Sequence, residues 1–192
     1  MLQGEQKESG VSVDAPFLKV IVEEVDRLNK VVTQFLDYSR PLNSAEKKSI
    51  SVSQLFEKVV DFFNSEKFIN NKFAGIYLEV VPPAEGFDKL PKLYCIPEQI
   101  KQVLVNLLQN SVNSLASSLE VSSKKIRIGA YLISRRITER EIYHKQEIAI
   151  FVEDNGAGIL SENLDKIFVP FFTEKKSGTG LGLSISSRII EA

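Results

Sequence analysis

The sequence has little of what marks secreted, membrane-spanning or polyanion-binding proteins. Its single cysteine, Cys95, excludes an intrachain disulfide and fits a reducing compartment. No apolar run approaches the roughly 18 residues of a membrane-spanning helix, and the start, MLQGEQKESG, lacks the basic and apolar regions of a signal peptide. We therefore expect a cytoplasmic chain without direct membrane insertion, whose parent protein could still be membrane-anchored.

An excess of charge of one sign is absent as well. The 24 basic and 25 acidic residues give a formal net charge of -1, which provides no general attraction to nucleic acid. What is present is an ordinary globular composition, with 43% hydrophobic and 26% charged residues in a chain of 192. This length favours one full domain with an appendage, and nucleic acid is not an expected partner.

The N-terminal region predicts a long helix outside the main domain. Residues 1–13 are polar and are expected to be flexible, whereas Asp14 and Pro16 are suited to begin a helix over residues 14–42. Its apolar residues recur at alternating three- and four-residue steps, as in a heptad seam: Leu18, Ile21, Val25, Leu28, Val32 and Phe35. Such a helix could lie on its own domain's core or pack in a bundle. The narrow stripe and the polar linker at 43–48 favour the bundle.

The remaining chain, residues 49–192, predicts a single domain of mixed strands and helices. Strands are expected at 49–52, 76–81, 92–95, 125–134 and 147–153, and helices at 53–70, from Pro97 through Leu115, and at 181–191. The last two strands alternate in polarity and are expected to be antiparallel neighbours joined by a charged hairpin loop. This order predicts an α/β (α+β) fold, a two-layer sandwich of a mixed sheet and helices.

In the helix that follows Pro97, Asn106 and Asn110 lie four residues apart. They share one face of the helix, while the leucines between them point into the core. Asparagine is unfavourable inside a helix, so a pair on one face indicates a function. Two solvated surface side chains would show the same spacing.

Two glycine-containing segments follow, and both are typical of ligand-binding loops. Residues 154–159 (DNGAGI) come directly after a strand; their glycines allow close backbone approach, and the aspartate could accept a hydrogen bond from the amino group of adenine. Residues 178–183 (GTGLGL) open the last helix, where free amides form an anion site close to Lys175 and Lys176. Either segment alone could be an ordinary loop. The second does not resemble a Rossmann turn, because no strand leads directly into it.

Between the glycine segments, residues 167–173 (IFVPFFT) contain three phenylalanines within five positions. Large aromatic side chains are rarely left in water. We therefore expect Phe168, Phe171 and Phe172 to anchor this segment by packing against the protein.

In this order the four segments resemble the ATP-binding domain of sensor histidine kinases, within the superfamily of gyrase, heat-shock chaperone and mismatch-repair ATPases. Asn106-x-x-x-Asn110 resembles the N box, DNGAGI the first glycine box, FVPFF the F box and GTGLGL the second glycine box. The resemblance covers roughly residues 49–192, and residues 24–41 are similar to the second helix of the family's dimerisation domain. The short lid between the F box and the second glycine box, residues 173–177, is closest to the nitrogen-regulation sensor kinases.

The resemblance implies a transferase that uses ATP and Mg²⁺ to phosphorylate a protein histidine in a two-component phosphorelay. It implies that Asn110 ligates Mg²⁺ with support from Asn106, and that Asp154 receives the adenine amino group. The further ATP-binding residues that it implies are Gly156, Gly158, Lys175, Lys176, Gly178, Thr179, Gly180, Leu181 and Gly182. The implied partners are a histidine-bearing dimerisation domain, a response regulator receiver domain and a second copy of the chain.

The sequence departs from the family pattern in three places. The family's phosphoacceptor histidine lies on a helix that would precede residue 14, and the only histidine here, His144, is interpreted as a solvated loop residue. This chain alone is therefore not expected to autophosphorylate. Asn113 replaces a common lysine, so one phosphate contact is in question. Relatives also continue beyond Ala192, so we expect the sheet to lack a strand.

Two other functions stay open from the sequence. ATP-hydrolysing relatives place a glutamate four residues before the Mg²⁺-binding asparagine, as the base that activates water. Asn106 stands there and cannot accept a proton, which favours phosphotransfer over hydrolysis. The second alternative is a non-catalytic module that binds nucleotide or only dimerises, although every ATP-contact box is retained.

Overall fold

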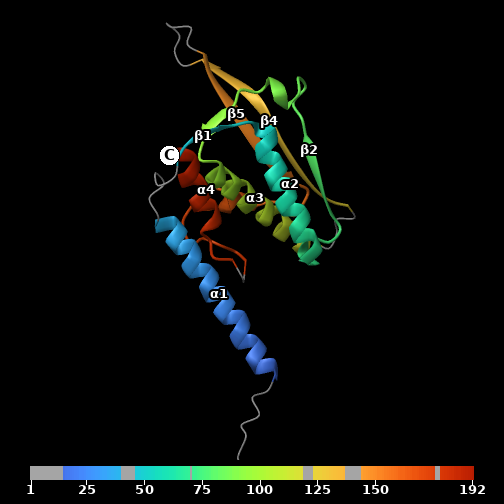
Figure 1. The fold of residues 1–192 in the computed structure, drawn as a ribbon. Coiled ribbons are helices and arrows are strands. Elements are labelled where there is room, and N and C mark those ends of the chain that lie inside the picture. The colour runs from blue at the N-terminus through green and yellow to red at the C-terminus, as the bar shows by residue number, and fades with distance from the viewer. Residues whose placement is uncertain (1–14, 40–45, 70, 119–122, 137–143, 176–177) are drawn as a thin grey trace, which may run out of the picture.

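The computed structural model describes residues 15–39, 46–69, 71–118, 123–136, 144–175 and 178–192. The flexible segment expected at the N-terminus, half of the expected linker, most of the expected hairpin loop and Lys176 lie outside these residues. In the described part, a long helix projects from a two-layer domain of strands and helices (Figure 1).

The helices are α1 (Ala15–Ser39), α2 (Val52–Ile69), α3 (Pro97–Ser117) and α4 (Gly182–Glu191). The strands are β1 (Lys48–Ile50), β2 (Ile76–Val81), β3 (Leu93–Cys95), β4 (Lys124–Arg136) and β5 (His144–Asp154). Short 3-10 turns are η1 (Asn71–Phe73), η2 (Phe87–Lys89) and η3 (Ser161–Asn163).

The main sheet has the strand order β2-β4-β5. Strand β4 pairs in parallel with β2 and antiparallel with β5, so the predicted mixed sheet and the antiparallel pairing of the last two strands are confirmed. Strands β1 and β3 form a separate antiparallel pair. The register places Ile126 opposite Asp154, so this carboxylate, at the end of β5, belongs to the same face of the sheet as the core residues of β4.

Helices α2 and α3 pack with this inner face of the sheet around one hydrophobic core. The core residues of α3 are Leu104, Leu108, Val112 and Leu115, all nearly inaccessible to water. Truncating one such leucine to alanine costs about 2–5 kcal/mol, so the core fixes the orientation of α3 strongly. Asn106 and Asn110 are only half-buried and lie outside this core.

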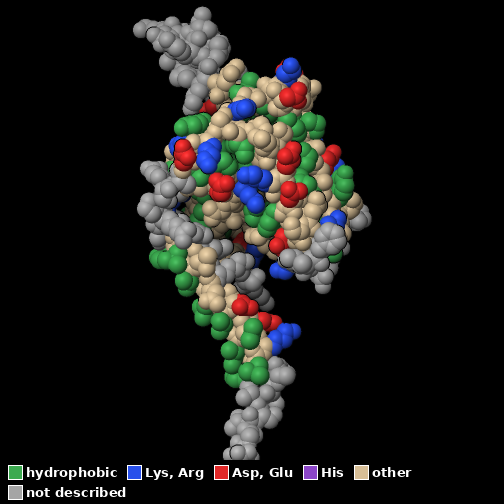
Figure 2. Space-filling view, viewed as in Figure 1, with side chains coloured by type: hydrophobic (Ala, Val, Ile, Leu, Met, Phe, Trp, Pro, Cys, Tyr) green, Lys and Arg blue, Asp and Glu red, His purple; other side chains and the backbone are tan. Residues whose placement is uncertain are grey.

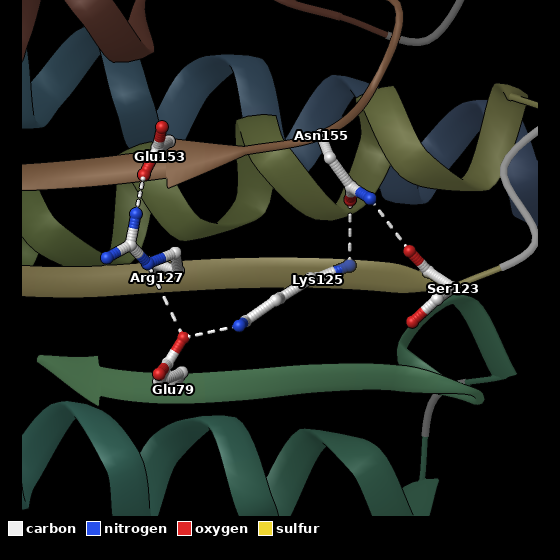
Figure 3. Close-up of polar contacts among 6 residues, drawn as sticks. All are labelled: Glu79, Ser123, Lys125, Arg127, Glu153 and Asn155. Carbon is white, nitrogen blue, oxygen red and sulfur yellow. Dashed lines mark hydrogen bonds and ion pairs between the residues drawn. The ribbon is translucent and has the colours of Figure 1, made fainter.

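The outer face of the sheet carries a ladder of ion pairs (Figure 3). Glu79 lies 2.6 Å from Lys125 Nζ and 3.4 Å from Arg127 Nε, and Arg127 Nη1 donates to Glu153 Oε2 at 2.8 Å. The hydrogen bond from Lys125 holds the pKa of Glu79 below its usual range. Such exposed pairs stabilise a fold little, but opposite charges across three strands favour one register.

Two expected boundaries are wrong. Residue Val52 begins α2 rather than ending a strand, because Ser51 caps the helix: the Gln54 N–H donates to Ser51 Oγ, and the Ser51 N–H donates to Gln54 Oε1, both at 3.2 Å. The hairpin strands are also longer than their alternating pattern predicts. His144 therefore belongs to β5, paired with Arg136, and is not a loop residue.

Helix α1 contacts α4 and otherwise extends away from the domain (Figure 1). Its apolar side chains lie in the open along the helix (Figure 2), with Val25, Leu28 and Val32 about half exposed. The predicted apolar stripe is thus not covered by the domain's own core. No helix in the described ranges has the length and hydropathy needed to cross a membrane.

Candidate ATP-binding site

Helix α3 is the element against which the predicted segments meet. Asn106 Nδ2 donates to the carbonyl oxygen of Gly182 at 3.3 Å, and Lys175 Nζ donates to Asn110 Oδ1 at 3.4 Å. The first glycine box reaches the same helix, because a Cβ added to Gly156 would collide with the Ser114 hydroxyl. Segments up to 80 residues apart in sequence therefore share one site around the polar face of α3.

Asn106 holds the start of α4 in place. Its amide nitrogen also lies 3.5 Å from Ser186 Oγ, and the Ser186 hydroxyl itself donates to the Gly182 carbonyl at 2.9 Å. This small network joins the N box to the second glycine box. The amide of Asn106 is thus engaged with α4, and it is positioned to orient that helix.

The N-terminus of α4 offers backbone N–H groups to a ligand. Leu181 is its N-cap residue and provides no side-chain hydrogen bond to the first turn. A Cβ added to Gly182 would meet nothing closer than 3.8 Å, so protein packing does not require this glycine, and a side chain would instead fill open space over the first turn. Leu181 is fully buried with Val103, Ile185 and Ile189, which fixes the helix start. An uncapped, open helix N-terminus of this kind suits an anion.

The first glycine box is shaped by its own side chains. The Gly156 N–H donates to Asp154 Oδ1 at 2.9 Å, which engages one of the two carboxylate oxygens. Asn155 ties the loop to the beginning of β4: its Oδ1 accepts from the Lys125 N–H at 2.8 Å and its Nδ2 donates to the Ser123 carbonyl at 2.7 Å (Figure 3). Asp154 is thereby held half-buried at the end of β5, on the inner face of the sheet.

The base of the lid is a close backbone contact between the F box and the second glycine box. The Phe171 N–H donates to the Gly180 carbonyl at 3.0 Å, and both residues are left-handed, with φ of 67° and 68°. A Cβ on Gly180 would collide with the backbone of Phe171, so only glycine fits there. A phenylalanine with positive φ is uncommon and costs about 1–2 kcal/mol, which the surrounding contacts must offset.

Within the lid, three further contacts fix the described residues. The Lys175 N–H donates to Thr173 Oγ1 at 3.1 Å, and the Gly178 N–H donates to the Lys175 carbonyl at 3.0 Å. Glu174 accepts a hydrogen bond from Asn163 Nδ2 at 2.6 Å, and Asn163 is buried in η3. The lid is therefore tied to η3 through Glu174 and to α3 through Lys175.

The expected burial of the F box is largely wrong. Phe168 and Phe171 are exposed, and only Phe172 is half-buried. Consecutive turns hold the segment instead, with backbone bonds from Ile167 to Asn163 and from Phe172 to Val169. Backbone hydrogen bonding therefore does the anchoring that we assigned to aromatic packing.

Lys175 brings a positive charge into the site. As a whole residue it is exposed, yet desolvation of its ammonium group lowers its pKa from the usual lysine range, while the Asp154 carboxylate acts in the opposite direction. Its ammonium therefore donates to Asn110, the asparagine predicted to bind the metal, and is attracted by the carboxylate of the first glycine box.

Asn110 offers one oxygen ligand, which fits an Mg²⁺ ion that takes its other ligands from phosphate and water. The described part of the chain contains no cluster of three or more His, Cys, Asp or Glu residues that could hold a metal ion by itself. Asn110 Oδ1 is, however, already the oxygen that faces a cation, the Lys175 ammonium. One amide oxygen suits an Mg²⁺ ion whose other ligands are phosphate oxygens and water.

Sequence reasoning missed four residues that shape the site: Ser114, Asn155, Asn163 and Glu174. Ser114 lies four residues after Asn110 on the same helix face, so its position was available from the sequence. Asn155 lies inside the first glycine box but was given no role. Nothing local in the sequence pairs Asn163 with Glu174.

A family model described as histidine kinase-, DNA gyrase B-, and HSP90-like ATPase matches residues 95–192, which contain α3, both glycine boxes and α4. The chain belongs to this family of ATP-binding domains. Its relatives place it further: it is an ATP-binding catalytic domain of the histidine kinase type.

Three relatives illustrate the likeness. The signal transduction histidine-protein kinase AtoS of Escherichia coli is 36% identical over 176 residues, covering 92% of this chain and 25% of AtoS. The sensory histidine kinase/phosphatase NtrB of Klebsiella oxytoca is 32% identical over 176 residues, covering 91% of this chain and 45% of NtrB. The solved catalytic domain of histidine kinase ThkA is 29% identical, with a TM-score of 0.53, and the match covers 77% of this chain and 81% of that one.

The chain thus spans less than half the length of the curated relatives named above. These relatives do not single out the nitrogen-regulation subgroup, because AtoS is more similar than NtrB.

Proposed function

We propose that the chain binds Mg-ATP at the site around α3 and transfers the γ-phosphoryl group to a histidine carried on another segment or chain. The observation that carries this proposal is that three segments meet α3: the first glycine box at Ser114, Lys175 at Asn110, and the uncapped start of α4 at Asn106. Phosphoryl transfer needs positioning and charge neutralisation more than covalent chemistry, and these groups supply both.

Each part of the nucleotide has a matching part of the site. The half-buried Asp154 would accept from the adenine amino group, with Gly156 and Gly158 shaping the pocket. The amides at the start of α4, with Gly178, Thr179, Gly180, Leu181 and Gly182, would cradle the phosphates. Asn110 would hold Mg²⁺, which, when bound, offsets phosphate charge. Lys175 and Lys176 would add positive charge at the lid.

Hydrolysis of ATP is the competing function, and the position of Asn106 disfavours it. An asparagine cannot act as the general base that activates water. Its amide is moreover engaged with Gly182 and Ser186 at the start of α4, which supports a role in holding that helix. We therefore infer that water is not activated from this position.

The expected base selectivity tests the ATP site. Replacing Asp154 with asparagine should lower ATP affinity at least tenfold, about 1.4 kcal/mol, because one charge-assisted acceptor for the adenine amino group is lost. Calorimetric titration of both forms measures this loss, and GTP should compete poorly against the unmodified chain. Equal competition by GTP and ATP would show that Asp154 does not read the base.

The domain assignment follows from the same proposal. Residues 14–42 would be a helix of the dimerisation domain, 43–48 a linker and 49–192 the cytoplasmic kinase domain. The partners would be a histidine-bearing dimerisation domain, a response regulator receiver domain and a second copy of the chain. The exposed apolar stripe of α1 supports the last of these.

The dimer has a direct test on this stripe. The intact chain should be a dimer by light scattering at micromolar concentration, since burying one leucine or valine contributes about 1.5–3 kcal/mol. The double substitution Leu28→Lys and Val32→Lys should make it monomeric, because it places charges in the stripe. The control Asp26→Lys changes an exposed residue off the stripe and should stay dimeric. An unmodified chain that is monomeric at this concentration would refute the dimer.

A further inference from the structure

One hydrogen bond in the site couples the lid to the predicted metal ligand. Lys175 Nζ lies 3.4 Å from Asn110 Oδ1, the same oxygen that would ligate Mg²⁺ under the proposed function. An ammonium and a divalent cation against one amide oxygen repel each other, because Mg²⁺ binds at about 2.0–2.1 Å and the two positive charges are then only a few ångströms apart near a protein surface. Each cation therefore weakens the binding of the other at Asn110.

The lid holds Lys175 in this place by several independent contacts. Glu174 accepts from the buried Asn163, and its neighbour Lys175 reaches Asn110 on α3. Thr173 accepts from the Lys175 N–H, and the Gly178 N–H donates to the Lys175 carbonyl. The ammonium thus meets Asn110 from a backbone that is fixed on both sides.

The carboxylate of Asp154 adds an electrostatic reason for this arrangement. Its attraction for the Lys175 ammonium raises the pKa of Lys175 and so opposes the effect of desolvation. The ammonium thus donates to the amide oxygen of the N box and is also attracted by a carboxylate that is proposed to bind adenine. Both of its partners are groups that the nucleotide and its metal would need.

We propose that Lys175 is an internal cation that occupies the Mg²⁺ position at Asn110 in the nucleotide-free state and gives it up when Mg-nucleotide binds. This inference rests on the proposed ATP site and deepens it. Lys175 then sets how strongly nucleotide binding depends on Mg²⁺. It supplies the positive charge when the metal is absent, and it must leave Asn110 when the metal is present.

The test compares ADP affinity with Mg²⁺ and with a chelator, by calorimetry on the full chain. In Lys175→Met, the ADP affinity with Mg²⁺ divided by the ADP affinity with chelator should rise at least fivefold. Without Mg²⁺, the variant binds ADP more weakly because the positive charge of the lysine is gone. With Mg²⁺, its binding no longer carries the cost of displacing the lysine from Asn110. Lys175→Arg keeps a cation and should restore the ratio. Lys166→Met removes an exposed charge just before the F box segment and should leave the ratio unchanged.

A second readout needs no nucleotide. The side-chain amide signal of Asn110 in the NMR spectrum of the free chain should shift in Lys175→Met and not in Lys166→Met. Equal losses of affinity with and without Mg²⁺, or an unshifted Asn110 signal, would overturn the inference and leave Lys175 as a simple phosphate contact. Absence of ADP binding by the unmodified chain in either condition would instead refute the proposed function itself.

Discussion

Replacing Asn110 with aspartate should abolish measurable Mg-ATP binding while leaving the chain folded. The new carboxylate would lie 3–4 Å from the Lys175 ammonium, whose present distance to Asn110 Oδ1 is 3.4 Å, and would form an ion pair that holds the lysine in place. It would also repel the phosphates; like charges about 4 Å apart cost roughly 4 kcal/mol near a protein surface. We expect an affinity loss of at least a hundredfold, about 2.7 kcal/mol.

The matched control is Gln102→Glu on the same helix. It makes the same change from amide to carboxylate eight residues earlier, roughly 12 Å along the axis, where salt screens most of the repulsion. Calorimetry should show near-normal affinity for this control. A folded Asn110→Asp chain with near-normal ATP affinity would exclude Asn110 from the metal and phosphate site.

Replacing Gly180 with alanine should have the largest effect on the lid. A methyl group there would collide with the Phe171 backbone, and φ of 68° is unfavourable for any side chain. The collision would break the Phe171 N–H to Gly180 carbonyl bond that closes the lid base. We expect a loss of at least about 2 kcal/mol in the free energy of unfolding and more than a tenfold loss of ATP affinity.

Gly158→Ala is the control that separates the cost of the collision at Gly180 from the cost of a left-handed backbone. Gly158 has a similar φ of 75°, but a Cβ there would meet nothing within 4 Å. Its stability cost should therefore be limited to the left-handed conformation, about 1 kcal/mol. Urea denaturation measures both variants. Equal costs for the two glycines would mean that the contact between Phe171 and Gly180 does not hold the lid base.

The residues predicted for the site could be found from the sequence because each of their patterns lies within one short stretch of chain. The spacing of Asn106 and Asn110 is set by one turn of helix, and the glycine boxes are continuous in sequence. The start of α2 was also available from the sequence, since Ser51 and Gln54 form a capping box at the standard spacing. In these places local chemistry decides the structure.

The contacts that join separate segments could not be read in this way. Asn163 meets Glu174, and Gly156 meets Ser114, because the fold brings their segments together. Nor does hydrophobicity alone predict that Phe168 and Phe171 stay exposed, because turns fix the backbone of that segment without side-chain burial. Pairings of this kind depend on the three-dimensional arrangement, which periodicity does not encode.

The transfer of phosphate tests the central claim most directly. The chain would be incubated with γ-labelled ATP and Mg²⁺, with and without a separate helical domain that carries the family's phosphoacceptor histidine. The account predicts label on the histidine domain only when both proteins are present, no labelling of the chain alone, and little release of free phosphate. Steady release of free phosphate by the chain alone, or an unlabelled histidine domain although ATP binds, would contradict it.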